Sequence, residues 1–203
     1  MRPPVSQIIL QQMRSEGSEP MEFQIEEYVK HTIYPYEHPF DDAWTIELGC
    51  GGYWYYIYKD YLPFLKVQVP TQPPFCTGAI ILHDNLIIGS NDYGIYKINL
   101  KDIKNQTDFR IKHIETDDSF RSFAVDRDVF YMLGMHRVSA FDSDLHLLWK
   151  SQYLSADGVC FKSIEGDIMT VECCLEPWSE DWFDAKISSL DGSIIYTPIE
   201  FHE

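Results

Sequence analysis

Short apolar runs separated by turn residues fill the chain from residue 41 onward. Most runs have about four to seven residues and recur about every 8–12 residues, with Asp, Asn or Gly between them. Such runs are too short for ordinary helices, and the residues between them favour tight turns, so the pattern predicts an antiparallel all-β domain. The expected strands are 44–48, 53–58, 65–69, 79–82, 86–88, 95–98, 109–114, 123–125, 129–133, 138–141, 145–149, 159–163, 168–174, 182–187 and 194–199.

Three of the predicted turns recur at nearly constant spacing. They contain Asn85, Asp128 and Asp167, which are 43 and 39 residues apart. A period of about 40 residues with four strands is the spacing of a β-propeller blade. Four blades are the lower limit for a closed ring, so the pattern fits either a small or open β-propeller or a twisted β-sandwich with the same period. The blade-like units are expected at 76–115, 119–150 and 157–199, with a degenerate first unit at 44–69.

The first 40 residues follow a different pattern. Val5, Ile8 and Ile9 have helical spacing and predict a short amphipathic helix over 4–14, which a linker-like segment then ends. Segment 23–29 fits either a strand or a short helix. We therefore expect an N-terminal helix and extended linker at 1–40, and a single β domain of about four blade-like units at 41–203.

The charge of the chain limits its partners. With 32 acidic and 16 basic residues the formal net charge is −16, and such a surface repels phosphate backbones, which argues against nucleic-acid binding. No apolar run approaches the roughly 20 residues of a membrane helix, so no membrane partner is expected. The N-terminal apolar run is too short for a secretion signal, so we expect a soluble, cytoplasmic protein.

Few residues suggest catalysis. The five cysteines form no CxxC pair, and adjacent Cys173 and Cys174 would point to opposite faces of a strand, so reduced and mostly buried thiols are expected rather than a metal site. No GxGxxG, P-loop or GxSxG motif occurs, and acidic pairs such as Asp41 and Asp42 fit solvated turns. We therefore expect no enzyme, no catalytic residue, no metal and no cofactor.

Acidic residues and aromatic rings occur together near the C-terminus. Segment 172–184 contains five acidic residues, two Trp and one Phe. An aromatic anchor surrounded by carboxylates suits an interface with a basic protein, because the ring supplies buried area and the acids supply fast, oriented encounter. The alternative is that Trp182 and Phe183 belong to the core and that the acids only keep the protein in solution. The candidate partner-binding residues are Glu176, Trp178, Glu180, Asp181 and Asp184, with Asp117 and Asp118 from an earlier loop.

Three segments resemble known families. The segments 138–149 and 187–196 each have a strand, an Asp-containing turn and a second strand, and both resemble the outer hairpin of pyrroloquinoline-quinone-type propeller repeats; Gly192 stands in the second turn and Leu145 in the first. The WD-repeat signature is absent. Segment 182–192 is similar to the C-terminal hairpin of some small bacterial toxin-immunity proteins.

These features lead to one main hypothesis and two alternatives. The main hypothesis is a non-catalytic acidic inhibitor of the immunity type that binds and occludes a basic toxin, such as a nuclease, as a heterodimer. The first alternative is a ligand- or carbohydrate-binding β-propeller that uses exposed aromatics at 53–58 and at Trp178 and Trp182 as stacking platforms. The second alternative is a scaffold subunit of a larger complex.

Overall fold

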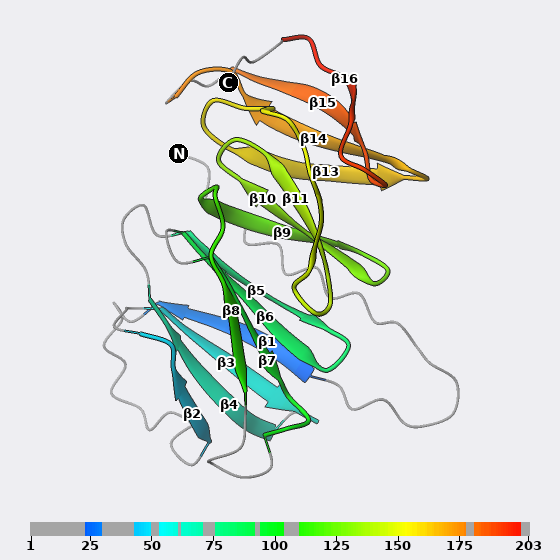
Figure 1. Cartoon of the computed structure of the whole chain (residues 1–203). Helices are drawn as coiled ribbons and strands as arrows, with labels where there is room; N and C mark the ends of the chain where they lie inside the picture. The colour runs from blue at the N-terminus through cyan, green and yellow to red at the C-terminus, as the bar shows by residue number, and fades with distance from the viewer. Residues whose placement is uncertain are drawn as a thin grey trace.

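A computed structural model of the chain describes residues 23–29, 43–49, 53–60, 62–70, 76–91, 94–103, 110–177 and 181–199. Within these ranges the protein is all-β, with sixteen strands in four four-stranded sheets, which we call blades A to D (Figure 1). The all-β prediction with four-stranded repeats is confirmed. The helix predicted over 4–14 lies outside the described residues.

Blades B, C and D are antiparallel meanders whose strands follow one another in chain order. They correspond to the three units predicted from the 40-residue spacing. Blade B contains β5 (Thr77–Leu82), β6 (Asn85–Ser90), β7 (Gly94–Asn99) and β8 (Ile111–Ile114), and blade C contains β9 (Phe120–Asp126), β10 (Val129–Gly134), β11 (Val138–Asp142) and β12 (Leu147–Lys150). Blade D contains β13 (Val159–Glu165), β14 (Ile168–Cys174), β15 (Trp182–Ser188) and β16 (Ile194–Tyr196).

Blade A departs from the predicted antiparallel pattern. It contains β1 (Phe23–Val29), β2 (Trp44–Glu47), β3 (Tyr53–Lys59) and β4 (Leu62–Val69) in the order β1-β3-β4-β2, and β2 pairs with β4 in parallel. In the sheet, β4 lies between β3 and β2. Because β4 and β2 both run opposite to β3, they run in the same direction and pair in parallel. Segment 23–29, which fitted a strand or a helix, forms β1 and pairs with β3.

The same tight turn joins two strands in every blade. Asp60, His83, Arg127 and Gly166 each follow the last paired residue of a strand and have positive φ angles of 50°, 55°, 55° and 60°. Positive φ at the first loop residue is the geometry of the hairpin turns whose twist matches that of the flanking strands. The turns that revealed the repeat in the sequence are therefore also equivalent in conformation.

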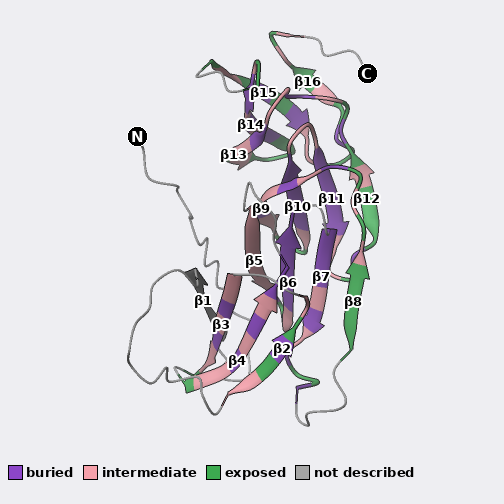
Figure 2. Cartoon of the chain, turned by 90° about the vertical axis from the view of Figure 1, so that its left-hand side faces the viewer, coloured by how far each residue is buried: buried purple, intermediate pink, exposed green. Residues whose placement is uncertain are grey.

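The blades form an open arc of β-propeller type. The first strands of neighbouring blades contact one another, β1 with β5, β5 with β9, and β9 with β13. The last strands β8, β12 and β16 lie on the opposite side of the molecule (Figure 2). Blades A and D lie at opposite ends of the stack (Figure 1). This arrangement favours the propeller over the sandwich alternative.

An apolar core fills the space between each pair of neighbouring blades. This explains why some strands are apolar at nearly every position and others only at every second position. Leu86 and Ile88 of β6 are buried against blade A, whereas Ile87 is buried against blade C. Strands buried on both faces have nearly continuous apolar runs. In blade D, by contrast, Met169 and Val171 face the core shared with blade C and alternate with less buried residues. Blades A and D thus have one outer face each.

Candidate functional site

The outer face of blade D is polar and is organised by one lysine. Glu172 of β14 and Asp184 of β15 lie directly opposite each other, a like-charge pairing that is unfavourable by itself. Lys162 of β13 offsets this, because its Nζ lies 2.7 Å from Asp184 Oδ1 and 3.5 Å from Glu172 Oε1. The hydrogen bond to Asp184 raises the pKa of Lys162, so the lysine stays charged. Asp184, predicted to bind a partner, thus already has a partner within its own sheet.

Two further residues predicted in the segment 172–184, Glu176 and Asp181, lie on the connection between β14 and β15. Glu176 and Asp181 are exposed there, and the Leu175 N–H donates to the Asp181 carbonyl oxygen at 3.0 Å. Trp178 and Glu180 lie outside the described residues. Phe183 is half-buried and packs against the core shared by blades C and D.

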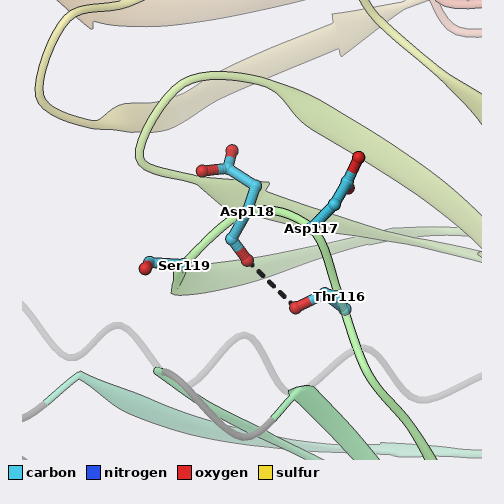
Figure 3. A pocket seen from close by; sticks show the side chains of 4 residues that line it. All are labelled: Thr116, Asp117, Asp118 and Ser119. Atoms are coloured by element: carbon cyan, nitrogen blue, oxygen red, sulfur yellow. Dashed lines mark hydrogen bonds between the residues drawn. The ribbon is translucent and has the colours of Figure 1, made fainter.

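Asp117 and Asp118 lie elsewhere, on the loop from β8 to β9 between blades B and C (Figure 3). Asp117 pairs with Lys150, whose hydrogen bond lowers the pKa of the Asp117 carboxyl. Asp118 is only 6% exposed, and its Oδ2 accepts the backbone N–H groups of His136 at 3.0 Å and Arg137 at 2.9 Å. Asp118 therefore fixes the turn between β10 and β11 instead of facing a partner.

The hollow beside these two residues is small. It has a volume of about 190 Å³ and is lined by Thr116, Asp117, Asp118 and Ser119. The Thr116 hydroxyl donates to the Asp118 carbonyl oxygen at 3.0 Å, and the Asp118 carboxylate points away from Thr116 (Figure 3). Ligand pockets usually measure about 300–1,000 Å³. The hollow is thus below the usual size of a substrate site.

Negative charge is concentrated at one end of the arc. Residues 151–203 contain eleven acidic and two basic residues, whereas residues 43–150 contain thirteen acidic and eleven basic residues. In blades B and C many of these acids are paired, as in Lys97–Asp144 at 2.6 Å and His83–Asp128 at 2.9 Å. Blade D is therefore the acidic end of the described structure.

Two turns of blade D meet and form a second surface, which we call the hairpin end. It comprises the β13–β14 turn with Glu165 and Asp167, the β15–β16 turn with Leu190 and Asp191, and the flanking Ile168 and Ile195. The Ser189 N–H donates to the Asp167 carbonyl oxygen at 2.9 Å and holds the two turns together. The hairpin end lies at the opposite end of the sheet from the β14–β15 connection, because successive turns of a meander alternate between its ends.

The sequence contained a signal for the hairpin end that the prediction did not use. The turns at 165–167 and 190–192 are separated by two strands, so an antiparallel meander places them at the same end of the sheet. Each turn carries acidic residues next to an exposed aliphatic side chain, Ile168 or Leu190. The site prediction followed the richest acidic run along the chain, and not the acids that the meander brings together.

Three of the described thiols, those of Cys76, Cys160 and Cys173, have the environment of structural cysteines. Burial raises the pKa of Cys76 and Cys160, and it raises the pKa of Cys173 to about 12. A thiol that stays protonated at neutral pH is a poor nucleophile. Within the described ranges, no group of three His, Cys, Asp or Glu side chains is placed to hold a metal ion, and no helix is long and apolar enough to cross a membrane.

The aromatic strand β3 is divided between two faces of blade A. Tyr55 is buried and its hydroxyl donates to Thr77 Oγ1 of blade B at 2.8 Å, while Tyr53 packs against the same core. The alternation of the strand places Trp54, Tyr56 and Tyr58 on the other face, where they are half-buried. Two of the five aromatic rings of this strand are therefore part of the structure between blades A and B.

No protein-family model and no curated protein matches the sequence. Among solved structures, the Pan2 WD40 domain of Neurospora crassa aligns with 70% of this chain and 45% of that chain, at 7% identity and a TM-score of 0.52. Apo AztD from Citrobacter koseri aligns with 70% of this chain and 38% of that chain, at 14% identity and a TM-score of 0.38. The chain thus spans less than half the length of either neighbour.

The likeness to the Pan2 domain shows that the chain has a β-propeller-type fold. The fold is shared although the WD-repeat signature is absent from the sequence. The resemblances to pyrroloquinoline-quinone-type repeats and to toxin-immunity proteins are not confirmed by these comparisons.

Proposed function

We propose that this chain is a non-catalytic protein-interaction module of β-propeller type, and that its acidic blade D binds a basic protein. The observation that supports the proposal is the uneven distribution of charge. Eleven acidic and two basic residues occur in 151–203, against a near balance in 43–150. Residues 1–42 have a smaller surplus, with eight acidic and three basic residues. A charge surplus that is largest in one blade gives an attractive field with a direction, which accelerates and orients the approach of a cationic partner.

The arc makes blade D available for such a contact. Blades B and C are covered on both faces by their neighbours, so they present mainly their edges and turns. Blade D has an outer face and a hairpin end, where Glu165 and Asp167 are exposed, and Glu176 is exposed on the β14–β15 connection at the other end of the sheet. An inhibitor of a basic toxin is a narrower form of the same proposal, and a scaffold subunit that holds a basic neighbour is another.

The test compares two charge-matched triple variants of the full chain. One neutralises blade D (Glu165→Gln, Asp167→Asn, Glu176→Gln), and the other neutralises exposed acids of blades A and B (Glu47→Gln, Asp60→Asn, Asp102→Asn). Each variant is immobilised, and proteins captured from a cell extract at low salt are identified and their isoelectric points compared.

We expect the unaltered chain to capture basic proteins that are released as salt increases, and the blade D variant to lose most of them. The variant in blades A and B should keep them. Equal loss from both variants would mean that net charge alone attracts the captured proteins. Captured proteins that are not basic would also contradict the proposal.

A further inference from the structure

We infer that the hairpin end of blade D is the contact surface for this partner, and that it accepts a segment combining aliphatic side chains with Lys or Arg. The inference rests on the proposed function, because it names the surface and the chemistry of the partner for the same acidic blade. The sequence predicted the contact on the β14–β15 connection, whereas the hairpin end lies at the opposite end of the sheet.

Aliphatic side chains are unusually exposed at this surface. Leu190 is 68% exposed, Ile195 51% and Ile168 40%. On the neighbouring blade C, Leu147 and Leu148 of β12 are also exposed. The two blades are joined there, since the indole N–H of Trp149 donates to the Ser189 carbonyl oxygen at 3.1 Å. Figure 2 shows the exposed residues of β12 and β16 along the same side of the arc. Grouped apolar side chains in contact with water indicate an interaction surface.

Carboxylates border these aliphatic side chains. Glu165 and Asp167 precede Ile168, and Asp191 follows Leu190. Ser193 donates to Asp191 through its N–H at 3.0 Å and its hydroxyl at 2.7 Å, and these bonds lower the pKa of Asp191. Asp191 is therefore ionised at neutral pH.

The two lysines of blade D lie away from the carboxylates of Glu165, Asp167 and Asp191, so they do not neutralise them. Of the two lysines in the described part of 151–199, Lys162 pairs with Asp184 and Glu172 on the outer face, and Lys186 lies opposite Thr170 in the middle of the sheet. A partner with Lys or Arg beside its own apolar groups would complement both the carboxylates and the aliphatic side chains of the hairpin end. A second copy of this chain, placed symmetrically on the same surface, would instead bring the same carboxylates together.

The backbone of the surface is already ordered before any partner binds. The Ser189–Asp167 hydrogen bond joins the two turns, and Trp149 ties the β15–β16 turn to blade C. A preformed surface loses less conformational entropy on binding, so the exposed aliphatic side chains can contribute to affinity.

The experiment measures the affinity of the full chain for a fluorescent peptide of alternating Leu and Lys, with an oligolysine of the same length as the charge-only probe. Leu190→Ser is compared with Leu62→Ser in blade A, because the two leucines are 68% and 69% exposed. Glu165→Gln with Asp167→Asn is compared with Glu47→Gln with Asp60→Asn. Circular dichroism and thermal unfolding confirm that each variant is folded.

We expect Leu190→Ser to weaken binding of the Leu–Lys peptide by about fivefold or more, as for a central aliphatic contact, and Leu62→Ser to change it by less than about twofold. Neutralising Glu165 and Asp167 should weaken both probes and reduce the salt dependence, and the oligolysine should bind more weakly than the Leu–Lys peptide.

Three results would overturn the inference, and they separate it from the proposed function. Equal effects of Leu190→Ser and Leu62→Ser, with the Glu165 and Asp167 variant still weaker than its control, would refute the apolar contact but leave an acidic blade that binds cations. Equal effects within both pairs would refute both proposals. Failure of the Leu–Lys peptide to bind, while the oligolysine binds, would refute the combined chemistry of the partner.

Discussion

The indole of Trp149 in blade C packs directly against the backbone of Gly192 in blade D. A Cβ atom at Gly192 would lie 2.5 Å from Trp149 Cε3, and the φ angle of this glycine is +74°. The two residues belong to the hairpins at 138–149 and 187–196, whose sequences resemble each other and which occupy equivalent positions in adjoining blades. This contact joins the outer edges of blades C and D.

We expect Gly192→Ala to destabilise the protein by more than about 2 kcal/mol, because the new methyl group meets both an unfavourable φ angle and the indole ring. Gly166→Ala is the matched control. Gly166 has a φ of +60°, and a Cβ atom there would have no neighbour within 4 Å, so its substitution should cost only about 1 kcal/mol. Urea unfolding of both variants provides the comparison. Equal losses would contradict the contact between Trp149 and Gly192.

Leu145 is expected to tolerate glycine better than alanine. This residue has a φ of +62° although it is not glycine, and its side chain is buried in the core between blades B and C. Both substitutions lose the same leucine contacts, but glycine also relieves the left-handed backbone, which costs other residues about 1–2 kcal/mol. Leu145→Gly should therefore be more stable than Leu145→Ala by about 1 kcal/mol.

The control for this prediction is Leu133, which is buried in β10 without a positive φ angle. There the ordinary order should hold, with Leu133→Ala more stable than Leu133→Gly in urea unfolding. The same order at both positions would show that the backbone at Leu145 is not strained.

The blades could be predicted from the sequence because their signals are local. The turns after Leu82, Asp126 and Glu165 each need a residue that accepts a positive φ angle between two apolar runs, and they recur at a nearly fixed spacing. Blade A was harder, because the run at Trp44–Glu47 carries no information about the direction of its neighbour. β2 pairs in parallel with β4, although β3 comes between these two strands along the chain.

The candidate site was predicted less completely, because its chemistry depends on pairings across strands. Asp184 was expected to be available to a partner, yet Lys162 from two strands away in the sheet binds it. Asp118 is identical in type to Asp117 and adjacent to it, but only the fold decides which of the two turns inward to bind the backbone of His136 and Arg137. A charge count along the sequence does not contain these contacts.

Asp118 and Asp117 should therefore respond very differently to alanine. Asp118→Ala removes two hydrogen bonds to a charged acceptor in a buried turn and should cost about 2–4 kcal/mol. Asp117→Ala removes a mostly exposed ion pair with Lys150 and should cost less than about 1 kcal/mol. Urea unfolding at neutral pH measures both, and a larger loss for Asp117→Ala would refute the structural role of Asp118.

The last prediction concerns Cys173 and alkaline pH. Burial raises the pKa of this thiol from 9.0 to about 12, so between these values the unfolded chain loses a proton that the folded chain keeps. The stabilising effect of the raised pKa is fully present below 9 and is lost as pH rises toward 12. Stability should thus fall by about 1.4 kcal/mol from this group alone between about pH 7 and about pH 10.

Cys173→Ala removes the titrating group, so its stability deficit relative to the unaltered protein should shrink by this amount between the two pH values. Val171→Ala serves as the control, because Val171 is equally buried on the same strand and does not titrate. Its deficit should stay constant with pH, since every other titrating group is retained in both proteins. A Cys173→Ala deficit that also stays constant would mean that the thiol ionises as readily in the folded chain as in the unfolded chain.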